Sequence, residues 1–295
     1  MRTDSTWAAT GERGGTPGPA QSARDTAELL VGMPQLNSLG LSENWLLKEA
    51  GHRHWQHLAA GLGCRPGELR DAQGRRVYAA FTQVHLREAR LQDVQEDQPL
   101  RWHLDGTRVG RSRHYSRHLL VGADGALARL EMLSAFVARQ REGDNHSVLR
   151  VPMAAGAGTP DPAIAEEAAA CAEGARAVRA GAWLERFALD AHAQPLAAQA
   201  LRPCPSNDFN GAGLLYFASF QALADRAHWA WGLADGQASV RERQMVFHGN
   251  VNVGEMLELR LLARRAAGRG HWSWTQVCRG GDGRVIADIA THWAP

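Results

Sequence analysis

The chain has few cysteines, and their placement excludes several kinds of site. The four are far apart in sequence, and no two form a C-x-x-C pair: Cys64, Cys171, Cys204 and Cys278. This spacing argues against a redox motif or a zinc site and is typical of reduced thiols, so we expect a cytoplasmic protein. Three histidines, His52, His54 and His57, resemble metal spacing, but only the last two can share a helix face. We therefore expect no metal.

The chain also has little net charge and no long apolar run. Lys+Arg 33 against Asp+Glu 31 leaves a net charge of +2, which does not indicate a nucleic-acid or anionic membrane partner. No run of about eighteen apolar residues is present, so we expect no membrane-spanning helix. Residues 1–26 are rich in Gly, Thr, Ser and Pro and are predicted to be disordered.

The chain does contain an internal repeat, in which one sequence unit occurs twice. The first copy begins with Asn-Ser-Leu-Gly-Leu at residues 37–41 and reaches His54-Trp55; the second begins with Asn-Gly-Ala-Gly-Leu at residues 210–214 and reaches His228-Trp229. Each copy later shows His, an aromatic residue and Ser, and then Asp-Gly. A repeat of this size, present only twice, implies two similar domains packed as a pseudo-dimer, because solenoid repeats are shorter and more numerous. Clefts form at domain interfaces, so we expect the functional site between the copies.

Each copy predicts one long helix followed by antiparallel strands. The first helix is expected within residues 37–61, with Ser42 as its cap, and strands at 77–86, 100–105, 113–122 and 128–139. Asp124-Gly125 is typical of a hairpin turn. The second helix is expected at 213–233, and strands at 240–247, 256–266, 272–279 and 285–293.

This pattern predicts a domain organisation and a fold class. Residues 27–153 and 183–295 are the two expected domains, joined by an Ala/Gly/Glu-rich linker at 154–182 with a surface helix over 164–180. One helix and about four antiparallel strands, twice, predict an α+β protein with a tandem (double) hot dog fold, that is, two antiparallel sheets each wrapped around a central helix. Periodicity alone also fits another α+β sandwich, and the duplication favours the hot dog fold.

Several segments resemble a known enzyme family. Residues 210–220 (NGAGLLYFASF), continuing to Asp225-Arg226-Ala227, closely resemble the start of the second central helix in the LnmK-type bifunctional acyltransferase/decarboxylase family of leinamycin biosynthesis. The turn HGNVN at 248–252 resembles that family's following turn, and VGMP at 31–34 and VYAAF at 77–81 resemble it more weakly. The similarity covers roughly residues 30–294. Residues 37–49 depart from the pattern and resemble a sister group of uncharacterised biosynthetic-cluster proteins.

The resemblance implies a polyketide-pathway enzyme with a defined reaction. Such an enzyme takes methylmalonyl-CoA, acylates itself on a tyrosine, decarboxylates the acyl group and delivers propionyl to the phosphopantetheine arm of an acyl carrier protein. The family's tyrosine lies in a Tyr-x-x-Phe segment, which here is residues 78–81, so the implied catalytic residue is Tyr78. The implied partners are an acyl carrier protein and an acyl-CoA, and no cofactor is implied beyond the CoA or phosphopantetheine thioester itself.

The chemistry requires donors for a developing enolate oxygen. A glycine-rich turn entering a helix supplies backbone N–H groups and the positive end of the helix dipole. The turn at 210–213 fits this role, so Asn210 and Gly211 are expected catalytic residues and Gly213 a substrate-binding one. An ordinary helix entry with an Asn cap is the structural alternative.

Other residues are expected to bind substrate or to assist the tyrosine. His248 and Asn250 are expected in the pocket through their turn, and Asn37 and Gly40 through their equivalence to the second-copy turn. A phenol with a pKa near 10 needs a base or a nearby positive charge. His85 is expected on the opposite face of the strand from Tyr78, because side chains alternate, so it is a poor partner unless the strand contains a bulge.

Two other function classes remain open. A hot dog thioesterase or dehydratase acting on acyl-CoA or an acyl carrier protein needs a positioned carboxylate or a His–acid pair; Glu43 or Asp225 would serve in a thioesterase. A non-catalytic protein that binds an acyl carrier is the third class. A monomer or a homodimer is expected, since the tandem copies already supply a pseudo-dimer.

Overall fold

The computed structural model describes residues 25–110, 112–152, 161–233 and 238–295. The first half contains β1 (Asp25–Leu30), η1 (Met33–Gln35), β2 (Leu36–Asn37), β3 (Gly40–Leu41), α1 (Glu43–Gly61), η2 (Pro66–Glu68), β4 (Tyr78–Arg87), η3 (Leu91–Asp93), β5 (Pro99–Val109), β6 (Arg113–Gly122), β7 (Gly125–Arg139), η4 (Asn145–Ser147) and β8 (Val148–Arg150). The rest contains α2 (Pro162–Arg179), α3 (Ala182–Phe187), β9 (Ala197–Leu201), α4 (Pro205–Asp208), α5 (Phe217–Ala230), β10 (Ser239–Phe247), β11 (Leu257–Ala267), β12 (Gly270–Arg279) and β13 (Val285–Ala294).

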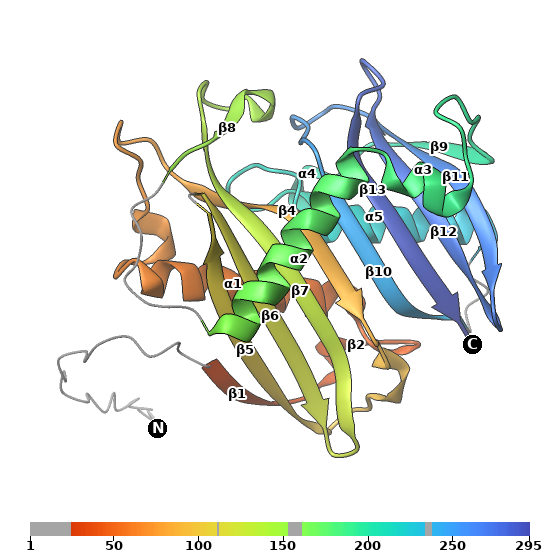
Figure 1. Ribbon diagram of the computed structural model, residues 1–295, viewed down its shortest axis with the longest axis horizontal. Coiled ribbons are helices and arrows are strands. Elements are labelled where there is room, and N and C mark those ends of the chain that lie inside the picture. The colour runs from red at the N-terminus through yellow and green to blue at the C-terminus, as the bar shows by residue number, and fades with distance from the viewer. Residues whose placement is uncertain (1–24, 111, 153–160, 234–237) are drawn as a thin grey trace, which may run out of the picture.

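The main strands form one antiparallel sheet whose two halves have the same strand order. The order is β1-β5-β6-β7-β4-β10-β13-β12-β11-β9, with β8 pairing β7. The first five strands mirror the last five about the β4–β10 junction (Figure 1). The expectation of two sheets is therefore refined: they join edge to edge through four residue pairs, from Arg243↔Leu86 to Val246↔Gln83.

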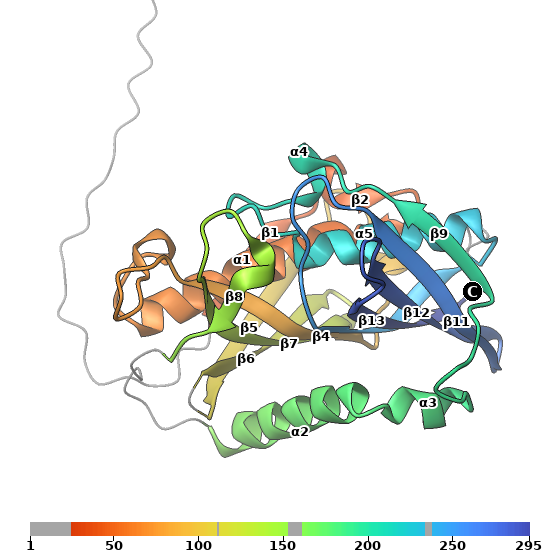
Figure 2. The ribbon, with the colours of Figure 1, turned by 90° about the horizontal axis from the view of Figure 1, so that it is seen from above.

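The central helices α1 and α5 lie on one face of this sheet, and α2 and α3 lie on the other (Figure 2). We call these the inner and outer faces. Ser42 caps α1 as expected, its Oγ accepting a hydrogen bond from the N–H of Trp45 at 3.3 Å. Buried apolar residues from both halves, among them Leu47, Phe220 and Ile289, form one shared core beneath the two helices.

The two central helices approach each other closely at Gly51. A Cβ placed on Gly51 would lie 2.7 Å from Cε1 of Phe217 and 2.9 Å from Oη of Tyr216. Asn44 ties the same interface, donating to the carbonyl of Ala218 at 2.9 Å. The start of α5 is thus positioned by direct contact with α1.

Most predicted elements are present, with differences at identifiable places. The second helix begins at Phe217 rather than at residue 213, because the preceding residues fold into a turn closed by the bridge Phe209↔Leu215. The edge strands β1 and β9 were not expected, nor was α3. The expectation of disorder over residues 1–26 is wrong for Asp25 and Thr26, which belong to β1. The rest of that segment, residues 1–24, and residues 153–160 at the junction of the expected first domain and linker lie outside the described residues. The linker helix is present as α2.

None of the helices in the described ranges is long and apolar enough to cross a membrane. The four cysteines are unpaired, as expected.

Candidate functional site

A cavity lies where the two halves of the sheet separate. The β4–β10 pairing stops at Val246↔Gln83. In the same register the next pairs would be Thr82 with Phe247, Phe81 with His248, Ala80 with Gly249 and Ala79 with Asn250. These eight residues instead line a cavity of about 320 Å³, within the usual range of small-molecule sites. We call it the wedge cavity.

An arginine lies at the narrow end of the wedge, where β4 and β10 separate. Nη2 of Arg179, at the end of α2, donates to the carbonyl oxygens of Thr82 and Phe247 at 3.0 and 3.1 Å. One guanidinium group therefore satisfies the first two backbone carbonyls that the strands leave unpaired. The separation of β4 from β10 is therefore stabilised by a side chain of the fold itself.

The start of α5 forms the inner wall of the wedge cavity. Tyr216, Phe217 and Phe220 all line it, and the rings of Phe81 and Phe217 lie 4.3 Å apart. No side chain caps α5, in contrast to α1. The first N–H groups of a helix carry partial positive charge, so this uncapped end favours an oxyanion in the cavity.

The expected Asn210 turn lies beside this helix start. Oδ1 of Asn210 accepts hydrogen bonds from the N–H groups of Ala212 and Leu214 at 3.0 and 3.1 Å. Asn210 lines the wedge cavity, and its Nδ2 makes no hydrogen bond with the described residues. It is therefore available as a donor. Gly213, at φ +68°, supplies the left-handed conformation of the turn, while neither it nor Gly211 lines the cavity.

Asn250 fixes this region by its own hydrogen bonds. Its Oδ1 accepts from the N–H groups of Leu215 and Val251 at 2.9 and 3.0 Å, and its Nδ2 donates to the carbonyl of Leu215 at 3.0 Å. The structure places Asn250 in the cavity wall as expected, with a positioning role.

A loop of the first half ties the two second-half turns together. Nδ2 of Asn145 donates to the carbonyls of Gly213 and Val251, both at 2.7 Å. Asn145 and His146 also line the wedge cavity. The wall is thus built from both halves.

His248 supplies a group suited to proton transfer. Its Nε2 lies 2.7 Å from Oδ2 of Asp288, whose Oδ1 accepts from Nε1 of Trp274 at 2.8 Å and from Nε2 of Gln276 at 3.1 Å. Because the carboxylate only accepts, Nε2 of His248 carries the hydrogen and Nδ1 is left with a lone pair. A carboxylate that fixes the tautomer of a histidine is a recurrent way to prepare a general base.

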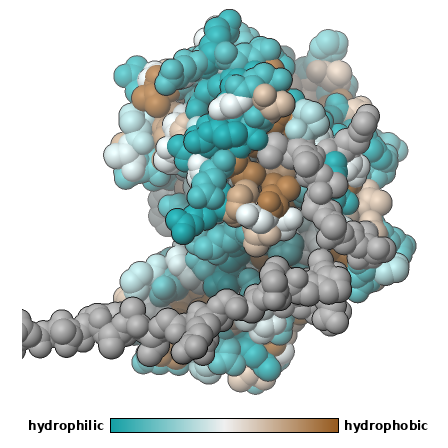
Figure 3. Space-filling model, turned by 90° about the vertical axis from the view of Figure 1, so that its left-hand side faces the viewer, coloured by the Kyte–Doolittle hydropathy of each residue, from teal (hydrophilic) through white to brown (hydrophobic). Residues whose placement is uncertain are grey.

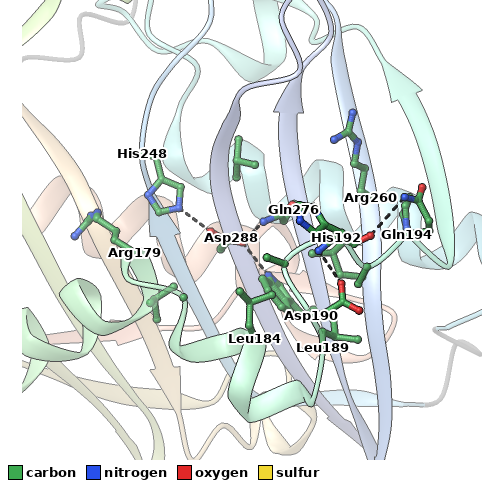
Figure 4. A pocket seen from close by; sticks show the side chains of 18 of the residues that line it. Arg179, Leu184, Leu189, Asp190, His192, Gln194, His248, Arg260, Gln276 and Asp288 are labelled. Carbon is green, nitrogen blue, oxygen red and sulfur yellow. Dashed lines mark hydrogen bonds and ion pairs between the residues drawn. The ribbon is translucent and has the colours of Figure 1, made fainter.

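His248 also separates the wedge cavity from a larger one. The second cavity, about 940 Å³, lies on the outer face between the sheet of the second half and α3 with the following loop. Figure 4 shows His248 and Asp288 directed toward each other on its floor, with Gln276 on the other side of the carboxylate. We call it the outer cavity. On a different face, at the end of the first half, Figure 3 shows apolar side chains in a recess with hydrophilic residues along one side.

Tyr78 lies near the wedge but is not one of its lining residues. Its ring is 5.4 Å from the guanidinium carbon of Arg76 and 5.6 Å from that of Arg139. Arg139 in turn donates to the carbonyl of Ala212 at 2.6 Å, so one arginine links the tyrosine to the Asn210 turn. Two guanidinium groups therefore lie beside the ring of Tyr78.

The strand β4 contains a bulge, which is the exception under which His85 and Tyr78 share a face. The pairing of β4 with β7 shifts at Thr82, between Phe81 and Gln83, and this bulge restores both side chains to the same face. The two remain roughly 20 Å apart along the strand. Instead His85 contacts Glu242, with Nε2 2.8 Å from Oε1.

The first-half counterparts do not join the site. Oδ1 of Asn37 accepts from the N–H of Leu39 at 2.8 Å in the β2–β3 hairpin, and neither Asn37 nor Gly40 lines the wedge or the outer cavity. Gly40 has a packing role: a Cβ there would lie 2.3 Å from the carbonyl oxygen of Leu91.

The candidate carboxylates for water activation are also placed elsewhere. Glu43 and Asp225 bracket the buried Arg243, with Nε 2.8 Å from Oε1 of Glu43 and Nη2 2.7 Å from Oδ1 of Asp225. Burial raises the pKa of Glu43 to about 7, with the charge of Asp225 adding to the effect and Arg243 opposing it. This ion cluster occupies the start of α1, the counterpart of the open end of α5.

The repeated histidines are structural. His54 is buried, with Nδ1 2.6 Å from Oγ of Ser116 and Nε2 2.7 Å from Oγ of Ser134. His228 contacts Oγ1 of Thr275 at 2.8 Å. Neither reaches Tyr78, and within the described ranges no cluster of His, Cys, Asp or Glu could hold a metal ion.

The sequence analysis did not identify Asp288, Arg179 or Asn145 as part of the site. The only sequence signal for Asp288 is that it is the single acidic residue of the expected strand 285–293, VIADIATHW. Arg179 ends the linker helix, and its sequence context carries no signal for a role at a strand junction 97 residues away from Thr82.

Comparison with known proteins gives the fold. No protein-family model and no curated protein matches the chain. Among solved structures it is similar to the 12:0-ACP thioesterase from Umbellularia californica, with a TM-score of 0.63, 10% identity, and coverage of 92% of this chain and 94% of that one. It is also similar to an acyl-ACP thioesterase from Bacteroides thetaiotaomicron VPI-5482, with a TM-score of 0.59, 9% identity, and coverage of 92% and 97%.

At these identities the likeness concerns the fold. Together with the mirrored strand order and the two central helices, it confirms the expected architecture. The chain has a double hot dog fold.

Proposed function

We propose that this protein is an enzyme that hydrolyses an acyl thioester bound in the wedge cavity. The observation that carries the proposal is His248, held by Asp288 from the side of the outer cavity, on the wall of the wedge cavity, which also borders the uncapped start of α5. A base and an oxyanion site on one cavity are the two requirements of acyl transfer to water. The fold's likeness to two structures described as thioesterases agrees with this reading.

The reaction uses groups already described. Nδ1 of His248 accepts a proton from a water molecule as the water oxygen attacks the thioester carbonyl carbon. The carbonyl oxygen becomes an oxyanion near Nδ2 of Asn210 and the N–H groups of α5. The carbon–sulfur bond then breaks, the thiol leaves with the proton returned by His248, and a carboxylic acid remains. Asp288 stabilises the imidazolium that forms between these steps.

The test is thioester hydrolysis by matched variants. Free thiol released from a panel of acyl-CoA and acyl-phosphopantetheine substrates is measured for the wild type, His248→Gln and Asp288→Asn. A positioned general base contributes about 10²–10⁴-fold, so both variants should lose activity on that scale. His52→Gln, an exposed position on α1, is the control and should retain it. Full activity in folded His248→Gln would refute the role of this pair.

A second candidate reaction is favoured by the surroundings of Tyr78. The guanidinium carbons of Arg76 and Arg139 lie 5.4 and 5.6 Å from the centre of its ring, and Arg139 also donates to the Asn210 turn beside the wedge cavity. In this reaction (methyl)malonyl-CoA is decarboxylated and the acyl group passes through Tyr78 to an acyl carrier protein, as the family resemblance implies. Intact-mass measurement after mixing with methylmalonyl-CoA and holo acyl carrier protein distinguishes the two. A propionyl adduct lost in Tyr78→Phe favours transfer, whereas free thiol and acid without an adduct favour hydrolysis.

A further inference from the structure

Three arginines from different elements gather on the outer face beside the wedge cavity. Arg113 of β6 pairs with Ala135 of β7, and Arg150 of β8 pairs with Val137 of the same strand. Paired residues share a face, and positions two apart on β7 do as well, so both side chains are on one face. We call Arg113, Arg150 and Arg179 the arginine cluster.

This face is the one covered by α2. Leu133, two residues before Ala135 on β7, packs with Ile164 and Ala168 of that helix. Arg179 stands at the C-terminal end of α2. The helix therefore brings its last arginine toward the two that the sheet presents.

The charges in the cluster are of one sign. Burial lowers the pKa of Arg113, with further lowering by the charges of Arg150 and Arg176; burial likewise lowers the pKa of Arg179, with further lowering by Arg150 and Arg113. In the described part of the chain, no ion pair joins a cluster arginine to a carboxylate, whereas the neighbouring Arg176 pairs with Glu173. Like charges held together without counter-charges destabilise a protein unless an anion joins them.

The cluster is continuous with the wedge cavity. Arg150 is itself one of the lining residues. Arg179 donates to the carbonyls of Thr82 and Phe247, which line the cavity from β4 and β10. An anion at the cluster would thus lie at the outer-face entrance of the cavity.

We infer that the arginine cluster binds the phosphate ester of the substrate's phosphopantetheine arm, so that the arm enters the wedge from the side of α2. The inference rests on the proposed thioester function. Guanidinium groups bind phosphate by paired, charge-assisted hydrogen bonds, which Arg113 and Arg150 can supply, while Arg179, whose Nη2 already donates to two backbone carbonyls, adds positive charge. The same phosphate ester occurs in CoA and on a holo carrier protein.

The test compares binding of pantetheine 4′-phosphate and pantetheine by calorimetry at low and moderate salt. The wild type should bind the phosphorylated compound about 10- to 100-fold more tightly, as one or two charge-assisted contacts provide. The double variant Arg113→Gln/Arg150→Gln should lose this difference. Arg264→Gln, exposed on β11 and outside the cluster, should keep it. Equal wild-type affinity for both compounds, or a difference retained by the double variant, would overturn the inference.

The outcome is separable from that of the proposed hydrolysis. His248→Gln should bind pantetheine 4′-phosphate like the wild type while losing turnover. Phosphate-dependent binding without any hydrolysis would refute the function and leave the binding site standing. Competition by CoA, or by holo but not apo carrier protein, identifies the source of the phosphate, and competition by neither overturns the assignment.

Discussion

Replacing Asn250 tests whether hydrogen bonds of this one side chain hold the start of α5 against the wedge cavity. The side chain makes three hydrogen bonds, two of them to the backbone of Leu215. Leu215 is 2% exposed, so in Asn250→Ala its N–H and C=O lose their partners in a buried setting. Each such group costs about 1–3 kcal/mol. We therefore expect a loss of about 2–6 kcal/mol, toward the lower end because water in the cavity can reach the site.

Asn250→Asp tests the loss of the hydrogen-bond donor separately from the loss of the acceptor. The carboxylate retains the acceptor for the N–H groups of Leu215 and Val251 and loses only the donor to the Leu215 carbonyl. One broken bond predicts a smaller cost, about 1–3 kcal/mol. Asn37→Ala is the matched control from the other copy, since its side chain accepts one hydrogen bond in an exposed hairpin. It should cost less than about 1 kcal/mol.

The assay is urea unfolding at neutral pH, with the free energy of unfolding taken from midpoints at an unchanged slope. The order of stability should be wild type, Asn37→Ala, Asn250→Asp, Asn250→Ala. An Asn250→Ala protein within about 0.5 kcal/mol of the wild type would refute the reasoning, because the two Leu215 groups would then be satisfied without the side chain.

Further predictions concern packing and pH. Gly51→Ala should lower the free energy of unfolding in urea by about 1–3 kcal/mol, because its methyl group would clash with the start of α5. Gly61→Ala has open space around it and should be neutral or stabilising. Equal effects of the two substitutions would contradict the close approach of α1 and α5. Burial lowers the pKa of His118 and of His228 to about 3. The unfolded chain therefore binds more protons below pH 6.5, so the free energy of unfolding should fall on acidification by up to about 1.4 kcal/mol per histidine per pH unit. Thermal midpoints should fall with it, and a flat profile from pH 6.5 to 5 would count against this reasoning. The pKa of Glu43, raised to about 7, has the opposite effect on stability, because here the folded chain binds the extra proton. The free energy of unfolding should therefore drop by about 1 kcal/mol from pH 6.5 to 8, and Glu43→Gln should abolish this drop.

The internal repeat made much of the fold predictable. Helix periodicity, the Ser42 cap and the Asp124-Gly125 turn each depend on neighbours in sequence, and the structure contains all three. The sequence predicts that the second helix begins at residue 213, whereas it begins at Phe217. The residues before it form a turn closed by the bridge between Phe209 and Leu215, and Asn250 of a distant turn holds Leu215 in place.

The site was only partly predictable, since its geometry depends on pairing between distant strands. Asn210, His248 and Asn250 were expected and line one cavity. The wedge itself follows from where the β4–β10 register ends, and the partner of His248, Asp288, comes from another strand. Neither fact leaves a local pattern in the chain. Whether Tyr78 is a nucleophile stays a prediction.

The joining of both halves in one polypeptide allows the two equivalent helix starts to differ. In a symmetric homodimer every substitution appears at both sites, so an ion cluster that filled the space at one helix start would also fill it at the other. Here Glu43 and Arg243 close the start of α1, while the start of α5 stays uncapped and borders a cavity. Because the two copies are covalently joined, their sequences can diverge independently. The start of α1 can then serve to hold the halves together, while the start of α5 can acquire a different chemical role.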